Sequence, residues 1–441
     1  MLVEGQYSLF SPDHDKLAGG SKRAVDLLDN RGAQAPQEIA NATATEALAA
    51  QPTVNEGALV TMTDDLAVLR EKPFCDAVAR FEELLLQGGP AWLIGAGCSK
   101  CAGLPLTDRL TSLALAGEEL NATSKEILEA IKIRFAGASA AHIEDYLSEL
   151  IDLLAIADRR VERGATSKGI ELDGRQYCAK QLREAADQIK IAIAAQINKK
   201  EIRIDTHRAF VAAVHRPPRP GKTDTERVAD YLVLNYDTSI EDALALERIP
   251  FSDGMDGGVT GWWSPRTFDR ERLEARVLKL HGSIDWFEVL DDPLPRRIAA
   301  SVRKGWPEER ILIWPASTKY RETQRDPYAQ LAERARRALR PADKTQRTLF
   351  ICGYGFGDTH INIEVDRAIR ESSENLTVVA FTSEAEPSGQ LKRWREDKET
   401  REQVLIFARR GFFHAGREIL AEHDLGWWKF EVLARLLGGE R

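Results

Sequence analysis

Four short apolar runs each end in glycine or in a polar side chain, and this pattern constrains the fold more than any other feature. The runs are residues 91–94, 231–234, 277–280 and 348–351. Apolar runs of this length, separated by helical stretches, are typical of buried parallel strands. Strands that alternate with helices indicate a mostly parallel sheet with right-handed crossovers. We therefore expect an α/β protein with a Rossmann-like sheet.

The residues that follow these runs are the candidates for chemistry. They are, in chain order, Gly95 and Gly97, then Asn235 and Asp237, then His281, and finally the glycine-rich residues 353–358. In an open parallel sheet, ligands bind outside the carboxyl ends of the strands. We expect these groups to form a site for chemistry on a nucleotide. The alternative is that Asn235 and Asp237 bond to loop amides and that His281 caps a turn.

The first glycine loop is typical of a turn that binds phosphate. Gly95 and Gly97 permit unusual backbone geometry and leave no Cβ atom between the main chain and a ligand. Main-chain N–H groups at the start of the next helix can then bind a diphosphate. The dinucleotide fingerprint is not met, because Lys100 occupies the place of its third glycine. A tight strand–helix turn without a ligand is the alternative.

Composition and periodicity divide the chain into two parts. Residues 1–62 have little periodic apolar content, and we expect an extension that is weakly ordered or docks in an oligomer. Residues 63–441 are expected to form one domain, with an inserted helical module at about 115–200 that is helical throughout. We expect residues 247–276 to be a long glycine-rich loop.

Charge and cysteine usage exclude several classes of protein. The net charge of -8 argues against general nucleic-acid binding. A basic helix at 328–341 is either an exposed face or a local contact for nucleic acid or an acidic partner. Five scattered cysteines argue against a secreted disulfide framework. We expect a cytoplasmic protein, because the chain has neither a long apolar run nor the pattern of a signal peptide.

Four motifs together resemble those of the sirtuins. Residues 95–99 (Gly-Ala-Gly-Cys-Ser), followed by Gly-Leu-Pro at 103–105, look like the sirtuin nucleotide loop. Residues 234–237 (Leu-Asn-Tyr-Asp) resemble the sirtuin Gln-Asn-Ile-Asp, and 280–283 (Leu-His-Gly-Ser) resemble the catalytic His-Gly. The glycine-rich stretch 353–362 is similar to that of prokaryotic sirtuin-like defence proteins. The four motifs stand in the same order as in that family.

The chain departs from the sirtuin deacylases in two places. Their zinc module needs two cysteine pairs, whereas this chain has one close pair, Cys98 and Cys101, inside the nucleotide loop. We therefore expect no zinc module and no metal site. Residues 106–109 replace the sirtuin Asp-Phe-Arg, which puts the acyl-lysine chemistry in doubt. The remaining pattern resembles that of sirtuin-like NAD hydrolases.

The resemblance implies that NAD is the substrate and that its nicotinamide–ribose bond is cleaved. We expect His281 to act as the general base, Asn235 to orient water or ribose, and Asp237 to hold the carboxamide or offset positive charge. Asp358 is expected to bind the adenosine ribose. The full set expected to bind NAD is Gly95, Ala96, Gly97, Ser99, Leu104, Pro105, Asp108, Gly353, Gly355, Phe356 and Asp358.

The same resemblance implies a role as an effector of antiphage defence that depletes NAD. Proteins of this type often form large homo-oligomers, and some act with a HerA-type ATPase. Two alternatives remain, a nuclease subunit of a HerA-type complex and a non-catalytic scaffold that binds NAD or ADP-ribose. The nuclease is the weaker alternative, because the sequence lacks the acidic cluster that two-metal cleavage usually needs.

Overall fold

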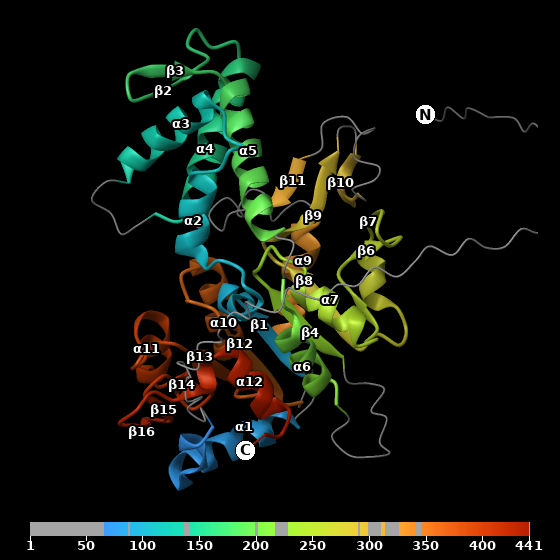
Figure 1. The fold of residues 1–441 in the computed structure, drawn as a ribbon, viewed down its shortest axis with the longest axis vertical. Helices are drawn as coiled ribbons and strands as arrows, with labels where there is room; N and C mark the ends of the chain where they lie inside the picture. Colours follow the sequence, from blue (N-terminus) through green and yellow to red (C-terminus); the bar gives the residue numbers. More distant parts are fainter. Residues whose placement is uncertain are drawn as a thin grey trace, which may run out of the picture. The chain divides into compact units, whose positions relative to one another are not determined.

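A nine-stranded, mostly parallel sheet forms the centre of the described chain (Figure 1). In spatial order its strands are β16 (Arg417–Leu420), β15 (Gly411–His414), β14 (Val404–Ala408), β13 (Leu376–Thr382), β12 (Arg347–Cys352), β1 (Ala91–Ile94), β4 (Ala229–Val233), β8 (Ala275–Lys279) and β5 (Phe251–Ser252). All neighbours from β14 to β5 pair in parallel, and β15 and β16 pair antiparallel. The expected α/β class with a mostly parallel sheet is confirmed.

The protein is represented by a computed structural model that describes most of the chain. The described residues are 66–86, 89–135, 141–198, 202–216, 228–289, 292–298, 310–313, 326–340 and 345–440. The extension expected at residues 1–62 lies outside them. None of the helices in these ranges combines the length and the apolar character needed to cross a membrane.

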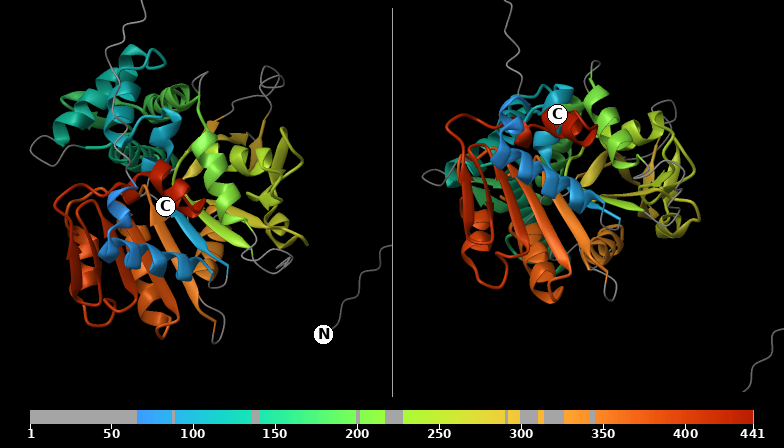
Figure 2. Two further views of the ribbon diagram at one scale, coloured as in Figure 1. Left: turned by 60° about the horizontal axis from the view of Figure 1, so that its bottom comes forward. Right: turned by 90° about the horizontal axis from the view of Figure 1, so that it is seen from below.

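Helices cover both faces of the sheet, which explains why its strands are apolar on both sides. One face carries α1 (Lys72–Leu85), α6 (Asp205–Val214), α7 (Ser239–Leu246) and α12 (Phe430–Leu437). The other face carries α9 (Tyr328–Leu339), α10 (Thr359–Glu371) and α11 (Gly389–Glu396). Within β1, Trp92 and Ile94 pack in the first core, and Leu93 packs in the second. Figure 2 shows α1 lying across the strands of the first face.

A helical block is inserted between β1 and β4. It consists of α2 (Thr107–Leu115), α3 (Ala122–Arg134), α4 (Ile143–Glu162) and α5 (Ala179–Ile197), which share a core of their own. The expectation of helix throughout 115–200 is wrong at one hairpin, formed by β2 (Ile170–Leu172) and β3 (Arg175–Tyr177). Asp173 and Gly174 have φ values of 47° and 73°, the left-handed pair that a tight two-residue hairpin needs.

A second, five-stranded sheet was not expected. Its strands lie in the order β11 (Arg310–Ile313), β9 (Gly282–Val289), β10 (Asp292–Arg297), β7 (Gly261–Trp263) and β6 (Met255–Asp256). The prediction of one long loop at 247–276 is therefore wrong, since β5, β6, β7 and the 3₁₀ helix η3 (Pro265–Asp269) lie there. Strands of two or three residues are too short to show an alternating pattern.

Three further 3₁₀ helices complete the described elements. They are η1 (Val68–Arg70), η2 (Ala96–Ala102) and η6 (Gly426–Trp428). The second of these follows β1 directly and therefore lies at the sheet edge where the candidate residues gather.

Candidate functional site

The four strands whose ends carry the candidate residues are neighbours in the sheet, in the order β12-β1-β4-β8. Ile94 pairs with Cys352 and with Val233, and Val233 pairs with Lys279, so the four ends are level. From β1 the chain proceeds to β4 and β8 on one side and later to β12 and β13 on the other. Such a reversal of strand order opens a crevice at the carboxyl ends, where open α/β sheets bind ligands.

The two glycine loops pack directly against each other. The Gly97 amide donates to the Gly353 carbonyl over 2.8 Å, and the Gly95 amide donates to the Cys352 carbonyl over 3.0 Å. A Cβ atom on Gly95 would lie 2.5 Å from the Gly353 oxygen, and one on Gly97 would lie 2.7 Å from the Gly353 Cα. The first two glycines therefore permit contact between the loops. A Cβ on Gly355, by contrast, would meet no described atom within 4 Å.

The residues after the first glycine loop lead into the helical block. The 3₁₀ helix η2 runs from Ala96 to Ala102, and its C-cap is Gly103, whose φ is 86°. Leu104 is buried in the core of the helical block. The Asp108 carboxylate is exposed and lies 3.1 Å from Nδ1 of His142. Of the residues expected to bind NAD, Leu104 and Asp108 thus have their described contacts in the helical block.

A chain of hydrogen bonds joins the first glycine loop to the end of β4. The Asn235 amide nitrogen donates to Ser99 Oγ over 2.8 Å, and Ser99 Oγ donates to Asp237 Oδ2 over 2.8 Å. The other Asp237 oxygen accepts from the Ser239 amide over 3.0 Å. All three side chains are buried. Asn235 Oδ1 is also buried, and no described residue bonds to it.

A buried lysine at the end of β8 binds the residues that follow β4. Lys279 is 0% exposed, and its ammonium donates to the Asp237 carbonyl oxygen. The same nitrogen lies 3.3 Å from Glu241 Oε1. Burial raises the pKa of Glu241 to about 7, against the opposing effect of the Lys279 charge. This pair was not predicted from the sequence, although a lysine inside an apolar run is a signal for a buried partner.

The His281 imidazole lies between two carboxylates. It is 3% exposed, and its Nε2 is 3.0 Å from Asp358 Oδ2 while its Nδ1 is 3.5 Å from Glu144 Oε1. Both ring nitrogens are therefore close to carboxylate oxygens. Neither nitrogen forms a hydrogen bond of good geometry within the described chain. Tyr236 completes the surroundings, with its ring centroid 6.4 Å from that of His281. Neither Glu144 nor Tyr236 was predicted from the sequence as a residue of the site.

The second glycine loop holds Asp358 in place. Asp358 caps α10, since its Oδ1 accepts from the amides of His360 (2.9 Å) and Ile361 (3.3 Å). The Tyr354 hydroxyl donates to the Asp358 carbonyl over 2.9 Å. Phe356, at a φ of 56°, has its ring 4.9 Å from that of Tyr354. Asp358 was expected at the adenosine ribose, and the structure places its Oδ2 atom 3.0 Å from Nε2 of His281.

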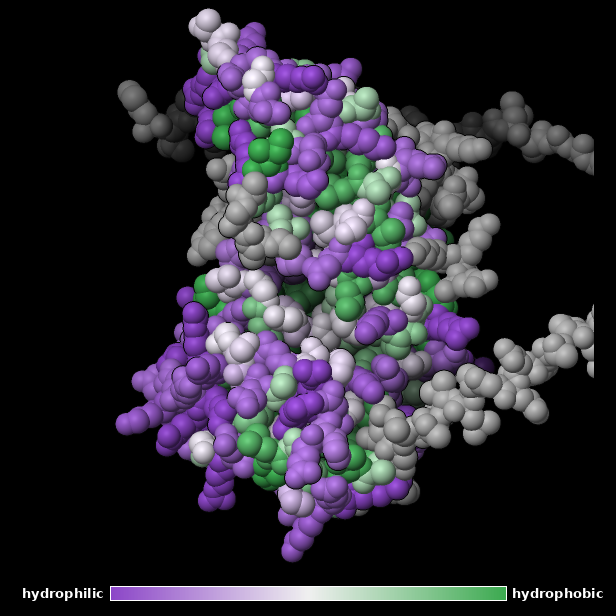
Figure 3. All heavy atoms as spheres, turned by 60° about the vertical axis from the view of Figure 1, so that its left-hand side comes forward, coloured by the Kyte–Doolittle hydropathy of each residue, from purple (hydrophilic) through white to green (hydrophobic). Residues whose placement is uncertain are grey.

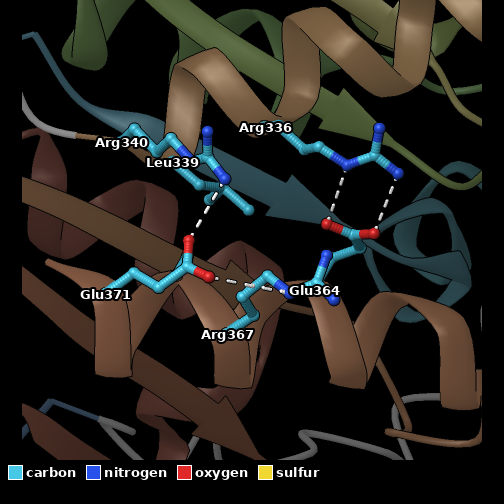
Figure 4. A pocket seen from close by; sticks show the side chains of 7 residues that line it. Arg336, Leu339, Arg340, Glu364, Arg367 and Glu371 are labelled. Carbon is cyan, nitrogen blue, oxygen red and sulfur yellow. Dashed lines mark hydrogen bonds and ion pairs between the residues drawn. The ribbon is translucent and has the colours of Figure 1, made fainter.

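The basic helix is α9, and its arginines have partners within the chain. The three arginines of α9 and its C-cap residue Arg340 pair as follows: Arg334 with Asp269, Arg336 with Glu364, Arg337 with Glu333, and Arg340 with Glu371. Figure 4 shows the pairs that link α9 to α10 around a crevice of about 10 Å³, room for roughly one water molecule. These contacts lower the positive charge that α9 presents to a partner.

The cysteines are free thiols, and two of them lie beneath the glycine loops. Cys98 Sγ is 3.5 Å from Cys352 Sγ, and burial raises the pKa of Cys98 well above its ordinary value. In the residues that the structure describes, no cluster of His, Cys, Asp or Glu side chains is arranged to hold a metal ion. His360 contributes its backbone amide to the cap of α10.

The strand-end site is thus a set of polar groups at the carboxyl edge of the sheet. Figure 3 shows the surface of one face hollowed between the helical block and the large sheet. Asn235 Oδ1 and the ring nitrogens of His281 are available to a ligand that donates and accepts hydrogen bonds. Asp358 Oδ2 adds a carboxylate beside the imidazole. This arrangement can bind hydroxyl groups and can accept a proton from one of them.

Comparisons with known proteins found a similarity over part of the chain. Residues 230–402 match the SIR2-like domain, a stretch that contains Asn235, His281 and Asp358. A solved chain described as "Structural Basis for the Mechanism and Regulation of Sir2 Enzymes" matches at 12% identity with a TM-score of 0.33, covering 71% of this chain and 87% of its own. No curated protein matches the sequence. Residues 230–402 are therefore similar to a SIR2-like domain, and they include strands of the mostly parallel sheet.

Proposed function

We propose that this chain is an NAD⁺ hydrolase that cleaves the bond between nicotinamide and ribose. One observation carries the proposal: Asn235 Oδ1 and both ring nitrogens of His281 are buried without directed partners in the described chain. Buried polar atoms are nearly always paired, so such a group at neighbouring strand ends favours a polar ligand. The SIR2-like match of residues 230–402 supports NAD as that ligand.

The chemistry follows from the bond that breaks. The nicotinamide–ribose linkage is a glycosidic bond to a cationic leaving group, and its cleavage develops oxocarbenium character at ribose C1′. The bonding pair goes to the ring nitrogen, so nicotinamide leaves neutral and needs no proton. Water forms the new bond to C1′ and loses one proton. The products are nicotinamide, ADP-ribose and H⁺.

His281 and Asp358 together suit the hydroxyl groups of a ribose. Nε2 of His281 and Oδ2 of Asp358 lie side by side, 3.0 Å apart, so neighbouring hydroxyls can each bond to one of them. Because Asp358 lies at the proposed general base, we assign it to the nicotinamide ribose instead of the adenosine ribose. His281 then receives the proton from water or from a ribose hydroxyl.

Asn235 and Asp237 have complementary roles in this mechanism. Asn235 donates its amide hydrogen to Ser99, which fixes the amide plane and presents Oδ1 as an acceptor for the attacking water. Both Asp237 oxygens accept hydrogen bonds within the chain. Asp237 therefore acts by holding Ser99 and by placing negative charge near the developing cation.

We further propose that the hydrolysis serves antiphage defence by depleting NAD in the cytoplasm. The similarity of residues 353–362 to prokaryotic sirtuin-like defence proteins supports this role. An NAD hydrolase that is always active would harm its host, so we propose control by assembly into a homo-oligomer or by a partner such as a HerA-type ATPase.

The test is an incubation of the purified chain with NAD⁺, with and without a partner ATPase encoded beside it, followed by measurement of free nicotinamide. Release of nicotinamide supports the proposal. Breakage of duplex DNA with NAD⁺ intact would support the nuclease alternative instead. Binding of NAD⁺ or ADP-ribose without turnover under both conditions would support the scaffold and overturn the hydrolase.

A further inference from the structure

The start of helix α4 in the helical block is held firmly near the strand-end site. The Ile143 amide donates to Thr111 Oγ1 of α2 over 2.9 Å. The His142 amide donates to Asp145 Oδ2 over 2.7 Å, which closes the first turn. Glu144 lies in this turn, where the helix dipole favours an ionised carboxylate. The position of its backbone is therefore set by α2 and by the cap of α4.

Tyr236 links this turn to the strand ends. It directly follows Asn235, and its ring is buried in the core of the helical block. Burial raises the pKa of Tyr236 well above its ordinary value, so the hydroxyl stays protonated. That hydroxyl donates to Glu144 Oε1 over 3.0 Å. The bond holds the carboxylate against the site.

The same carboxylate oxygen faces the imidazole. Glu144 Oε1 lies 3.5 Å from Nδ1 of His281. Bonds around catalytic groups are often long before substrate binds and shorten in the complex. A carboxylate on one ring nitrogen selects the tautomer that carries its proton there and leaves the opposite nitrogen as the base. Here the opposite nitrogen is Nε2, the one beside Asp358.

We propose that Glu144 is a positioning residue for His281, which it reaches from the helical block and holds in the tautomer protonated on Nδ1. The helical block is then part of the catalytic apparatus. This inference rests on the proposed NAD⁺ hydrolysis, in which Nε2 of His281 receives the proton. Asp358 Oδ2 lies nearer to the ring, 3.0 Å from Nε2, and competes with Glu144 for the ring proton until a ribose hydroxyl donates to it. With the ribose bound, Glu144 is the carboxylate that fixes the tautomer.

The kinetic test compares three site variants with one control. Glu144→Ala should lower kcat about 10- to 100-fold, a fraction of what a general base contributes, and should change KM for NAD⁺ by less than about 3-fold. Glu144→Gln retains an acceptor for the Tyr236 hydroxyl, so its kcat should fall less than that of Glu144→Ala. Tyr236→Phe should lower kcat by about 3- to 10-fold, and adding it to Glu144→Ala should cause no further loss. Glu149→Gln, which alters another α4 carboxylate that pairs with Arg134, should match the unaltered protein.

A spectroscopic test does not depend on activity. The ring ¹⁵N chemical shifts of His281 at mildly alkaline pH distinguish the two neutral tautomers. With ADP-ribose bound, so that a ribose hydroxyl engages Asp358, we expect the Nδ1-protonated form in the unaltered chain and in Glu149→Gln, and a shift toward the other form in Glu144→Ala. Unchanged ring shifts in Glu144→Ala, or an unchanged kcat, would overturn the inference. If the unaltered chain releases no nicotinamide, the proposed function fails, while the ring shifts still decide whether Glu144 orients the imidazole.

Discussion

The buried pair of Glu241 and Lys279 should make the stability of this protein depend on pH. Glu241 lies on α7 with 7% of its surface exposed, and burial raises its pKa from 4.5 to about 7. Lys279 lowers that pKa and only partly offsets the burial. Glu241 Oε2 is buried, and no described residue bonds to it. The folded state therefore favours the protonated carboxyl.

The raised pKa of Glu241 determines whether stability rises or falls with pH. Below pH 4.5 the carboxyl is protonated in both states, so its ionisation does not affect the free energy of unfolding. Between 4.5 and about 7 the unfolded chain releases the proton and the folded chain keeps it, so stability falls as pH rises. At about 1.4 kcal/mol for each pH unit, the full loss is roughly 3 kcal/mol and is complete above pH 7.

Urea denaturation at about pH 5 and about pH 8 measures this effect. Relative to Glu241→Gln, the unaltered protein should lose roughly 2–3 kcal/mol of unfolding free energy between the two pH values. Glu247→Gln is the matched control, because Glu247 follows the same helix and pairs instead with Arg208. If Glu241→Gln showed the same pH dependence as the unaltered protein, the assignment of a raised pKa to Glu241 would be wrong.

Two further predictions concern the glycine loops. Gly97→Ala should lower the free energy of unfolding by about 1–3 kcal/mol, because the new Cβ would meet the Gly353 backbone. Gly355→Ala should leave that free energy nearly unchanged. Urea denaturation of both variants measures the difference, and equal free energies of unfolding would refute the packing argument. In thiol labelling of the native chain, the exposed Cys75 and Cys178 should react quickly, while the buried Cys98, whose pKa burial raises, should react slowly together with Cys352. Rapid labelling of all five thiols would contradict the burial of that pair.

The central sheet could be predicted because its strands are buried on both faces. Residues 91–94 are apolar at every position, Thr348 is the one polar residue of 348–351, and this signal does not depend on the rest of the fold. The placement of Asn235 and His281 after neighbouring strands could also be predicted in outline, because the carboxyl ends of parallel strands share one edge. The strands that precede these two residues, β4 and β8, are paired neighbours in the sheet.

The second sheet and the surroundings of the imidazole could not be predicted from the sequence. His281 looked like the end of a strand, yet β9 begins at the next residue, Gly282, whose φ of 83° lets the chain turn at once. Glu144 lies far from His281 in the sequence, on a helix that has many other acidic residues. Only the packing of the helical block against Tyr236 reveals which carboxylate faces the ring.

The most direct measurement is the rate of nicotinamide release by matched variants of the active assembly. His281→Ala and Asn235→Ala should each lower kcat by about 100- to 10,000-fold while circular dichroism shows the fold intact. His423→Ala, which removes an exposed histidine near the C-terminus, should retain full activity. If His281→Ala released nicotinamide as fast as the unaltered chain, the strand-end site would not be where NAD⁺ is cleaved.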